Sequence, residues 1–316
     1  MALRAVIAAS LLVVAGLCRA QSVAYSAGEL AADGSQALYR VSLTGGTASR
    51  LGYVRDGGGN PVSALGGMTF GLDTQLYAIG APKGAQNPSL MTVATTLATA
   101  TMVSTISGLS ASASTGLSLS FSCDGHLWMA SSDSKNFWEL TPGTGQIRLV
   151  GNLGVKITAL ATSGNVLYGI GGSGNANLYT IATGTGVATK VGSYNASVSN
   201  PVDASFDSSG TLWGMIRNFD SANPSNLPSG LNALAQINPG TGAMTSAGTI
   251  ANPSQTNLTY PAPLSGLAVA PPTCSVTQPS SPSPAGAPVL SPIGLGLLFI
   301  VMLVSGHLWL FRFRPN

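Results

Sequence analysis

The 316-residue sequence predicts an all-β ring of five small sheets, and three observations support this prediction. A sequence motif made of a Leu-aromatic pair, a Gly-Thr-Gly turn and a closing Val-Gly or Ala-Gly recurs roughly every 40–50 residues. A strand of small apolar residues opens each repeat except the first. One further copy of that opening strand stands alone after the last repeat. Repeats of short strands at this spacing are typical of a β-propeller.

The motif is clearest in three consecutive repeats. It reads Leu127-Trp128, Gly143-Thr144-Gly145 and Val150-Gly151, then Leu167-Tyr168, Gly184-Thr185-Gly186 and Val191-Gly192, then Leu212-Trp213, Gly240-Thr241-Gly242 and Ala247-Gly248. Alternation such as Leu178-Tyr179-Thr180-Ile181 is typical of a strand with one buried face. Gly-Thr-Gly supplies the positive φ that a tight hairpin turn needs. Each repeat is therefore predicted to be one blade of antiparallel strands, with the Leu-aromatic pair packing between blades.

The opening strands give the number of blades. They begin near Gly67, Leu117, Ile157 and Val202, and the solitary copy spans Ser265 to Ala270. We expect this last copy to pair with the first strands, Val23 to Val54, because such a terminal closure leaves no free sheet edge in the ring. The prediction is a five-bladed β-propeller over residues 21–270. Its second blade fits least well, since Thr92 to Thr105 contains no Gly-Thr-Gly turn.

Residues 1–20 are predicted to be a secretory signal peptide that forms a helix. Arg4 is followed by an apolar run from Ala5 to Leu17, and the small residues Cys18 and Ala20 favour cleavage after Ala20. A lipoprotein modified at Cys18 is the less favoured alternative, because Leu17 is bulky where that pathway expects a small residue.

The other end of the chain predicts a membrane anchor. Ile293 to Phe311 contains no charged residue, and at about 1.5 Å per residue it nearly spans a hydrocarbon core as a helix. Arg312 and Arg314 follow it and should stay in the cytoplasm. Residues 271–287 are rich in proline and serine, which predicts an extended linker between the propeller and the anchor.

Residues 288–316, with their short motif, apolar helix and arginine tail, resemble the C-terminal sorting signals of the IPTL-CTERM class, a relative of the PEP-CTERM signals that exosortases handle. The residues that match the family motif are Pro288, Leu290, Ser291 and Gly294. With its repeats, the chain also resembles the low-charge secreted bacterial β-propeller proteins that often carry such tails. The resemblance implies that signal peptidase and a membrane sorting enzyme act on the chain. It also implies export to the cell envelope or cell surface, with initial anchoring in the inner membrane by the C-terminal helix.

Charge and cysteine content narrow the function classes. The terminal segments hold four of the 13 basic residues and none of the 10 acidic ones, so the body has a net charge of 9 − 10 = −1. This balance gives no support for a nucleic-acid partner. Cys123 and Cys274 remain outside the signal peptide, and an oxidising compartment would favour a disulfide between them. Two isolated thiols are the alternative, and the spacing does not match a metal site.

The connections between strands differ in length, and this difference predicts a binding face. First-to-second and most third-to-fourth connections are tight turns, whereas the long segments fall in the other two classes of connection. The long segments are Gly80–Pro88, Ser107–Thr115, Ser193–Asn200, Asn218–Asn232 and Ala251–Pro263. Both long classes leave the same face of an up-and-down propeller, where binding residues concentrate on β scaffolds.

The longest of these segments is the candidate ligand site. Its residues Arg217, Asn218, Phe219, Asp220 and Asn232 combine a cation, an aromatic ring, an anion and amides. This mixture suits a glycan or a peptide. A solvated loop without a ligand is the alternative.

No catalytic residue, metal site or cofactor is predicted. His126 lies beside a turn, and Asp73, Asp124 and Asp207 have the positions of turn residues. Asp203 is the one carboxylate on an opening strand, so no acid/base pair can be assigned. The sequence favours a non-catalytic surface or matrix binding protein. A hydrolase or lyase that uses the central channel, and a purely structural surface protein, are the alternatives.

Overall fold

The computed structural model describes residues 22–110, 116–172, 174–194, 201–217, 232–250 and 264–270. The predicted signal peptide (1–20), linker (271–287) and sorting signal with its helix (288–316) lie outside these ranges. The chain divides into two compact units, Met1–Val276 and Thr277–Asn316, and every described residue belongs to the first. A search of the described residues finds no helix with the length and hydropathy needed to cross a membrane.

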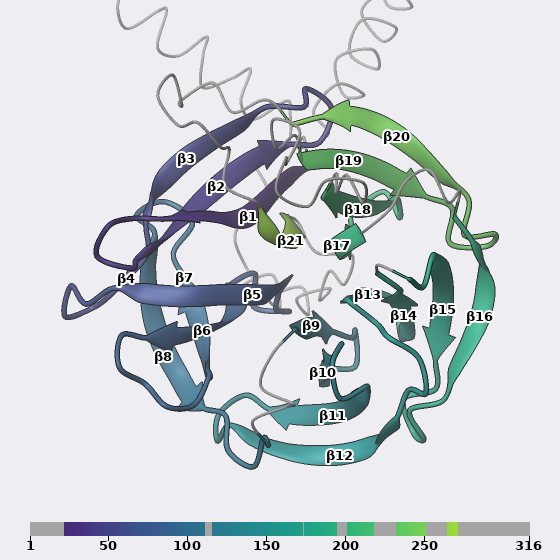
Figure 1. The fold of residues 1–316 in the computed structure, drawn as a ribbon, viewed down its shortest axis with the longest axis horizontal. Helices are drawn as coiled ribbons and strands as arrows, with labels where there is room; N and C mark the ends of the chain where they lie inside the picture. The colour runs from purple at the N-terminus through teal and green to yellow at the C-terminus, as the bar shows by residue number, and fades with distance from the viewer. Residues whose placement is uncertain are drawn as a thin grey trace, which may run out of the picture. The chain divides into compact units, whose positions relative to one another are not determined.

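The described residues form five separate sheets arranged as blades around a central axis (Figure 1). Blade 1 consists, from the axis outward, of β21 (Ser265–Ala270), β1 (Val23–Leu30), β2 (Gln36–Ser42) and β3 (Ala48–Tyr53). Blade 2 consists of β5 (Val62–Phe70), β6 (Leu76–Pro82), β7 (Ser89–Val93) and β8 (Thr99–Thr105), with the short β4 (Arg55–Asp56) parallel to β8.

The other three blades are regular four-stranded antiparallel sheets. Blade 3 consists of β9 (Leu117–Phe121), β10 (Leu127–Ser131), β11 (Asn136–Thr141) and β12 (Gln146–Asn152). Blade 4 consists of β13 (Ala159–Ser163), β14 (Val166–Ile170), β15 (Asn177–Ile181) and β16 (Ala188–Ser193). Blade 5 consists of β17 (Pro201–Phe206), β18 (Leu212–Arg217), β19 (Asn232–Ile237) and β20 (Met244–Thr249). The predicted all-β, five-bladed propeller is confirmed.

Strands from both ends of the described chain close the ring. β21 pairs antiparallel with β1, and the partners include Val23 with Ala270 and Ala27 with Ser265. The innermost strands contact one another in the order β21, β5, β9, β13, β17, and β17 contacts β21 again (Figure 1). The predicted terminal closure is therefore confirmed.

Blade 2 departs from the predicted pattern where it meets the axis. Its inner strand begins at Val62, before the predicted start near Gly67, and its pairing with β6 shifts register twice. Ala64 and Gly67 have positive φ values of 54° and 47°. These irregularities hide the strand from a search based on alternation, because a register shift changes which side chains face the core.

The hydrophobic core consists mainly of five clusters, each lying between two adjacent blades. The Leu-aromatic pair serves two of these clusters at once. Leu127 packs in the cluster between blades 2 and 3, whereas Trp128 packs in the cluster between blades 3 and 4. Neighbouring residues of a strand point to opposite faces, so the pair joins one blade to both of its neighbours. This confirms the predicted role of the pair.

The closing Val-Gly and Ala-Gly dipeptides form β-bulges. The pairing of the third and fourth strands shifts by one residue at this position in blades 3, 4 and 5, and at Leu51-Gly52 and Val103-Ser104 in blades 1 and 2. In blade 4, for example, Leu178 lies opposite Gly192 and Tyr179 opposite Lys190, so Val191 is the extra residue. Val191 packs against the cluster between blades 4 and 5. The bulge therefore turns an apolar side chain of the outer strand toward the next blade.

The two glycine motifs of the repeat meet across neighbouring blades. The last glycine of each Gly-Thr-Gly turn has positive φ, as predicted. A Cβ atom added at Gly192 would lie 1.8 Å from the carbonyl oxygen of Thr241, in the turn of the next blade. At Gly151 it would lie 2.1 Å from the carbonyl oxygen of Thr185. The outer rim is thus held by backbone-to-backbone contacts that leave no room for a side chain.

This contact predicts that Gly192→Ala destabilises the propeller, whereas Gly184→Ala in the same blade does not. The methyl group at residue 192 would collide with backbone, while a Cβ at Gly184 has no heavy atom within 4 Å. We expect Gly192→Ala to lower the free energy of unfolding by about 2 kcal/mol. The melting temperature should then fall by roughly 4–8 °C. Calorimetry of both variants tests this expectation, and equal melting temperatures would contradict it.

Candidate functional site

The propeller has two unlike faces. All five inner strands begin at one face, which we call the loop face, and end at the other, which we call the turn face. The second-to-third and fourth-to-first connections lie at the loop face, and the other connections lie at the turn face. The described strand ends that flank the long segments identified in the sequence all lie at the loop face, as predicted.

A cavity of about 630 Å³ lies at the loop-face end of the inner strands. Inner-strand residues form its floor, and the connection between β6 and β7 forms part of its wall. The lining residues that the argument below uses are Gly66, Gly67, Gly266, Asp203 and Leu117. Glycine backbone makes up much of the floor, and Asp203 is the one titratable side chain among the described residues that line the cavity.

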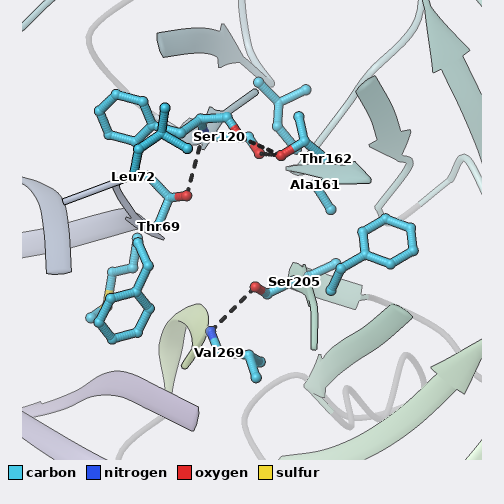
Figure 2. Close-up of a pocket in the computed structure, with 13 residues that line it drawn as sticks. Thr69, Leu72, Ser120, Ala161, Thr162, Ser205 and Val269 are labelled. Carbon is cyan, nitrogen blue, oxygen red and sulfur yellow. Dashed lines mark hydrogen bonds between the residues drawn. The ribbon is translucent and has the colours of Figure 1, made fainter. Parts of the chain in front are cut away.

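The turn-face end of the axis is nearly filled. The void there has a volume of about 30 Å³, which is room for roughly one or two water molecules. Figure 2 shows the hydroxyl groups around it. The hydroxyl oxygens of Ser120 and Thr162 are 3.0 Å apart, and the Val269 N–H donates to the Ser205 hydroxyl over 3.2 Å. Phe70, Phe121 and other apolar side chains complete the lining. A ligand would therefore reach the axis from the loop face.

Asp203 connects three inner strands at the cavity floor. Its carboxyl accepts hydrogen bonds from the N–H of Ala204 over 2.8 Å and of Leu267 over 2.7 Å, and from the N–H of Met68. The side chain is 3% exposed. Burial raises the pKa of Asp203 to about 8, against the opposing effect of the three hydrogen bonds.

The remaining aspartates that the sequence singled out belong to turns. Asp73 accepts the N–H of Gln75 over 3.1 Å. Asp207 accepts the N–H of Ser209 and the indole N–H of Trp213, each over 2.8 Å. Asp124 lies in the corresponding turn of blade 3 and accepts from Ser122 over 2.5 Å. These contacts confirm the assignment as turn residues.

His126 lies on the turn face, which is the face opposite the cavity. Its Nδ1 is 2.5 Å from Glu139, and its ring stacks on Trp128 with 5.5 Å between centroids. Hydrogen bonds from Arg148 and His126 hold the pKa of Glu139 below its usual value. This network joins three strands of one blade and is consistent with the structural role predicted for His126.

The predicted ligand-site residues are described only in part. Arg217 and Asn232 are the last residue of β18 and the first of β19, and their backbones pair. These two strand ends lie at the loop face. Asn218, Phe219 and Asp220 lie outside the described residues, and so do the sorting-motif residues Pro288, Leu290, Ser291 and Gly294.

Cys123 is disulfide-bonded and lies in the first turn of blade 3. Cys274, its predicted partner, lies outside the described residues. In the part of the chain that the structure describes, no three His, Cys, Asp or Glu side chains come together as a metal site.

Sequence reasoning missed the cavity itself. Its floor depends on Gly66-Gly67 within β5 and Ser265-Gly266 at the start of β21, two inner strands that are neighbours in the ring. The signal was present in the sequence as these glycines. It points to a close approach of backbones only once the strands are known to be adjacent.

No protein-family model matches the sequence, and no curated protein matches it. Solved structures are similar in fold. One is a structural genomics protein of unknown function from Bacteroides thetaiotaomicron, with 15% identity, a TM-score of 0.43, and coverage of 60% of this chain and 53% of that chain. This chain thus spans about half the length of that protein.

Two enzymes are also similar in fold. A catalytically inactive virginiamycin B lyase from Staphylococcus aureus has 14% identity and a TM-score of 0.40, covering 73% of this chain and 71% of that chain. An exo-β-1,3-galactanase from Clostridium thermocellum has 14% identity and a TM-score of 0.48, covering 74% and 63%. These likenesses concern the fold alone, and the five-bladed ring itself follows from the strand pairing.

The raised pKa of Asp203 predicts that the propeller loses stability as the pH rises. Between about pH 4 and pH 8 the folded chain keeps a proton that the unfolded chain releases, so the free energy of unfolding falls across this window and levels off above it. Urea unfolding from pH 5 to pH 9 measures this slope. Asp203→Asn should flatten it, and a wild-type stability that rises from pH 5 to pH 8 would contradict the assignment.

Proposed function

We propose that this chain is an exported, membrane-sorted propeller that binds a glycan or protein ligand at its loop face without catalysing a reaction. The observation that carries the proposal is the difference between the two ends of the axis. A cavity of about 630 Å³ lies at the loop face, whereas the void at the turn face is about 30 Å³. Ligand sites in proteins are concave and typically a few hundred Å³ or larger.

The chemistry of the cavity favours binding over catalysis. Acid/base catalysis needs a donor and an acceptor of protons within reach of one substrate. Among the described lining residues Asp203 is the single titratable group, and three backbone N–H groups already hold its carboxyl. Glycine backbone and small side chains form a preshaped surface, which suits recognition.

The direction of the chain also supports display of the loop face. β1 begins at Val23 and β21 ends at Ala270, and these two residues pair at the turn face. Ala270, the last described residue, therefore lies on the face opposite the cavity.

We expect Gly66→Leu to block ligand binding and Gly184→Leu to leave it unchanged. Gly66 lines the cavity, and a Cβ added there meets its nearest atom, the carbonyl oxygen of Leu117, at 3.9 Å. A leucine side chain would therefore fill the cavity without displacing backbone. Gly184 is an exposed turn-face residue with no heavy atom within 4 Å of its Cβ position.

Glycan and peptide arrays probed with the full chain in detergent provide the measurement. Any ligand that the wild type binds should lose at least about tenfold in affinity with Gly66→Leu. Equal binding by both variants would place the ligand elsewhere on the protein. Absence of any bound glycan or peptide would favour the purely structural alternative.

A further inference from the structure

We propose that the floor of the central cavity binds a primary ammonium group on a slender, unbranched stem, such as a lysine side chain, with Asp203 as its anionic partner. This inference rests on the proposed function and names the ligand class for the same cavity. Three features of the floor lead to it: its charge, its remaining hydrogen-bond capacity and its width.

The charge of the floor selects for a cation. The described lining residues include no Lys, Arg or His, so an ionised Asp203 has no positive partner there. Two strands packed against β17, β13 and β21, contain no titratable residue, and neither does β5, whose Met68 N–H donates to Asp203. β14 contributes Tyr168, which packs on Phe206 at the turn-face end of β17, and β18 carries Arg217 at its last position. A buried carboxylate without a counter-charge is costly, so the empty site favours the protonated carboxyl, and a bound cation offsets part of the cost of ionising it.

The carboxyl of Asp203 has capacity for one more donor. A carboxylate accepts about four hydrogen bonds, and the N–H groups of Ala204, Leu267 and Met68 supply three. These three bonds come from three different strands, so the orientation of the carboxyl is fixed before a ligand arrives. An ammonium group has donors only, which matches an acceptor among the residues that line the cavity.

The narrow floor and the apolar residues above it favour an unbranched stem. A Cβ atom added at Gly67 would lie 2.9 Å from the carbonyl oxygen of Leu117, and one added at Gly266 would lie 2.6 Å from the sulfur of Met68. The inner strands therefore approach one another closely beside Asp203. Ala64, Ile79 and Leu117 line the space above and offer apolar contact to methylene groups. An unbranched chain of CH₂ groups would lie against these apolar side chains, above the closely packed backbone, and bring its ammonium group to Asp203.

Binding of the ammonium should release a proton. Burial raises the pKa of Asp203 to about 8, so at neutral pH the empty site is mostly protonated. A cation at the floor favours the carboxylate and lowers that pKa. The affinity should therefore rise about tenfold per pH unit from pH 6 to pH 8 and level off above pH 8.

Titration calorimetry of the full chain in detergent tests the proposal, with 1-pentylamine, 1-pentanol and pentanoate as probes of equal length. We expect pentylamine to bind at least about tenfold more tightly than the neutral and anionic probes. Its binding enthalpy at pH 7 should vary with the ionisation enthalpy of the buffer, because a proton is released. Asp203→Asn should lose this preference and the pH dependence of affinity.

Two results would overturn the inference: pentanol binding as tightly as pentylamine, or no binding of pentylamine at pH 8. Both are measured on the wild type, so the test holds even where Asp203→Asn fails to fold. The array experiment tests the proposed binding function independently of the ammonium site. A glycan or peptide without a free amine that binds the wild type and not Gly66→Leu would sustain the binding function and reject the ammonium as its ligand.

Discussion

The whole ring depends on the seating of one short strand, β21, between blades that are far apart in sequence. Its backbone pairs with β1 on one side. On the other side, toward the axis, the N–H groups of Leu267 and Val269 donate hydrogen bonds to the side chains of Asp203 and Ser205 in blade 5. Leu267 and Val269 also pack in the cluster between blades 5 and 1, and Ala268 packs in the cluster between blades 1 and 2. Without this strand, two of the five interfaces between blades would lose their innermost layer.

The closure explains why the carboxyl group of Asp203 is buried at the centre of the ring. Inner strands belong to different sheets, so the N–H groups on their axial edges lack the partners that a continuous sheet would give them. Thr69, Ser120, Thr162 and Ser205 place their hydroxyl groups at these edges. Asp203 meets the same need with stronger acceptors for three strands, at the cost of desolvating a group that would otherwise ionise.

The architecture was predictable because the repeat encodes it locally. Alternation and the glycine turns predicted the blades, and a solitary fifth strand of the opening type predicted the closure. Contacts between repeats were not predictable from the same pattern. Nothing in Val191-Gly192 alone indicates a bulge, or that Gly192 faces Thr241 in another blade. Leu38-Tyr39 looks like the Leu-aromatic pair of the second strands, yet it lies on a third strand, because the first strand of its blade comes from the other end of the chain.

The candidate site was harder to predict than the fold for a related reason. Asp203 stood out in the sequence as the single carboxylate on an opening strand, but its partners Met68 and Leu267 come from either side of the closure. The glycines that shape the floor come from the same two strands, β5 and β21. Asp203 therefore takes part both in the hydrogen bonds that complete the ring and in the cavity that we propose as its binding site. A substitution at Asp203 must affect both, which is why the pH dependence of stability and the affinity for an ammonium probe have to be measured side by side.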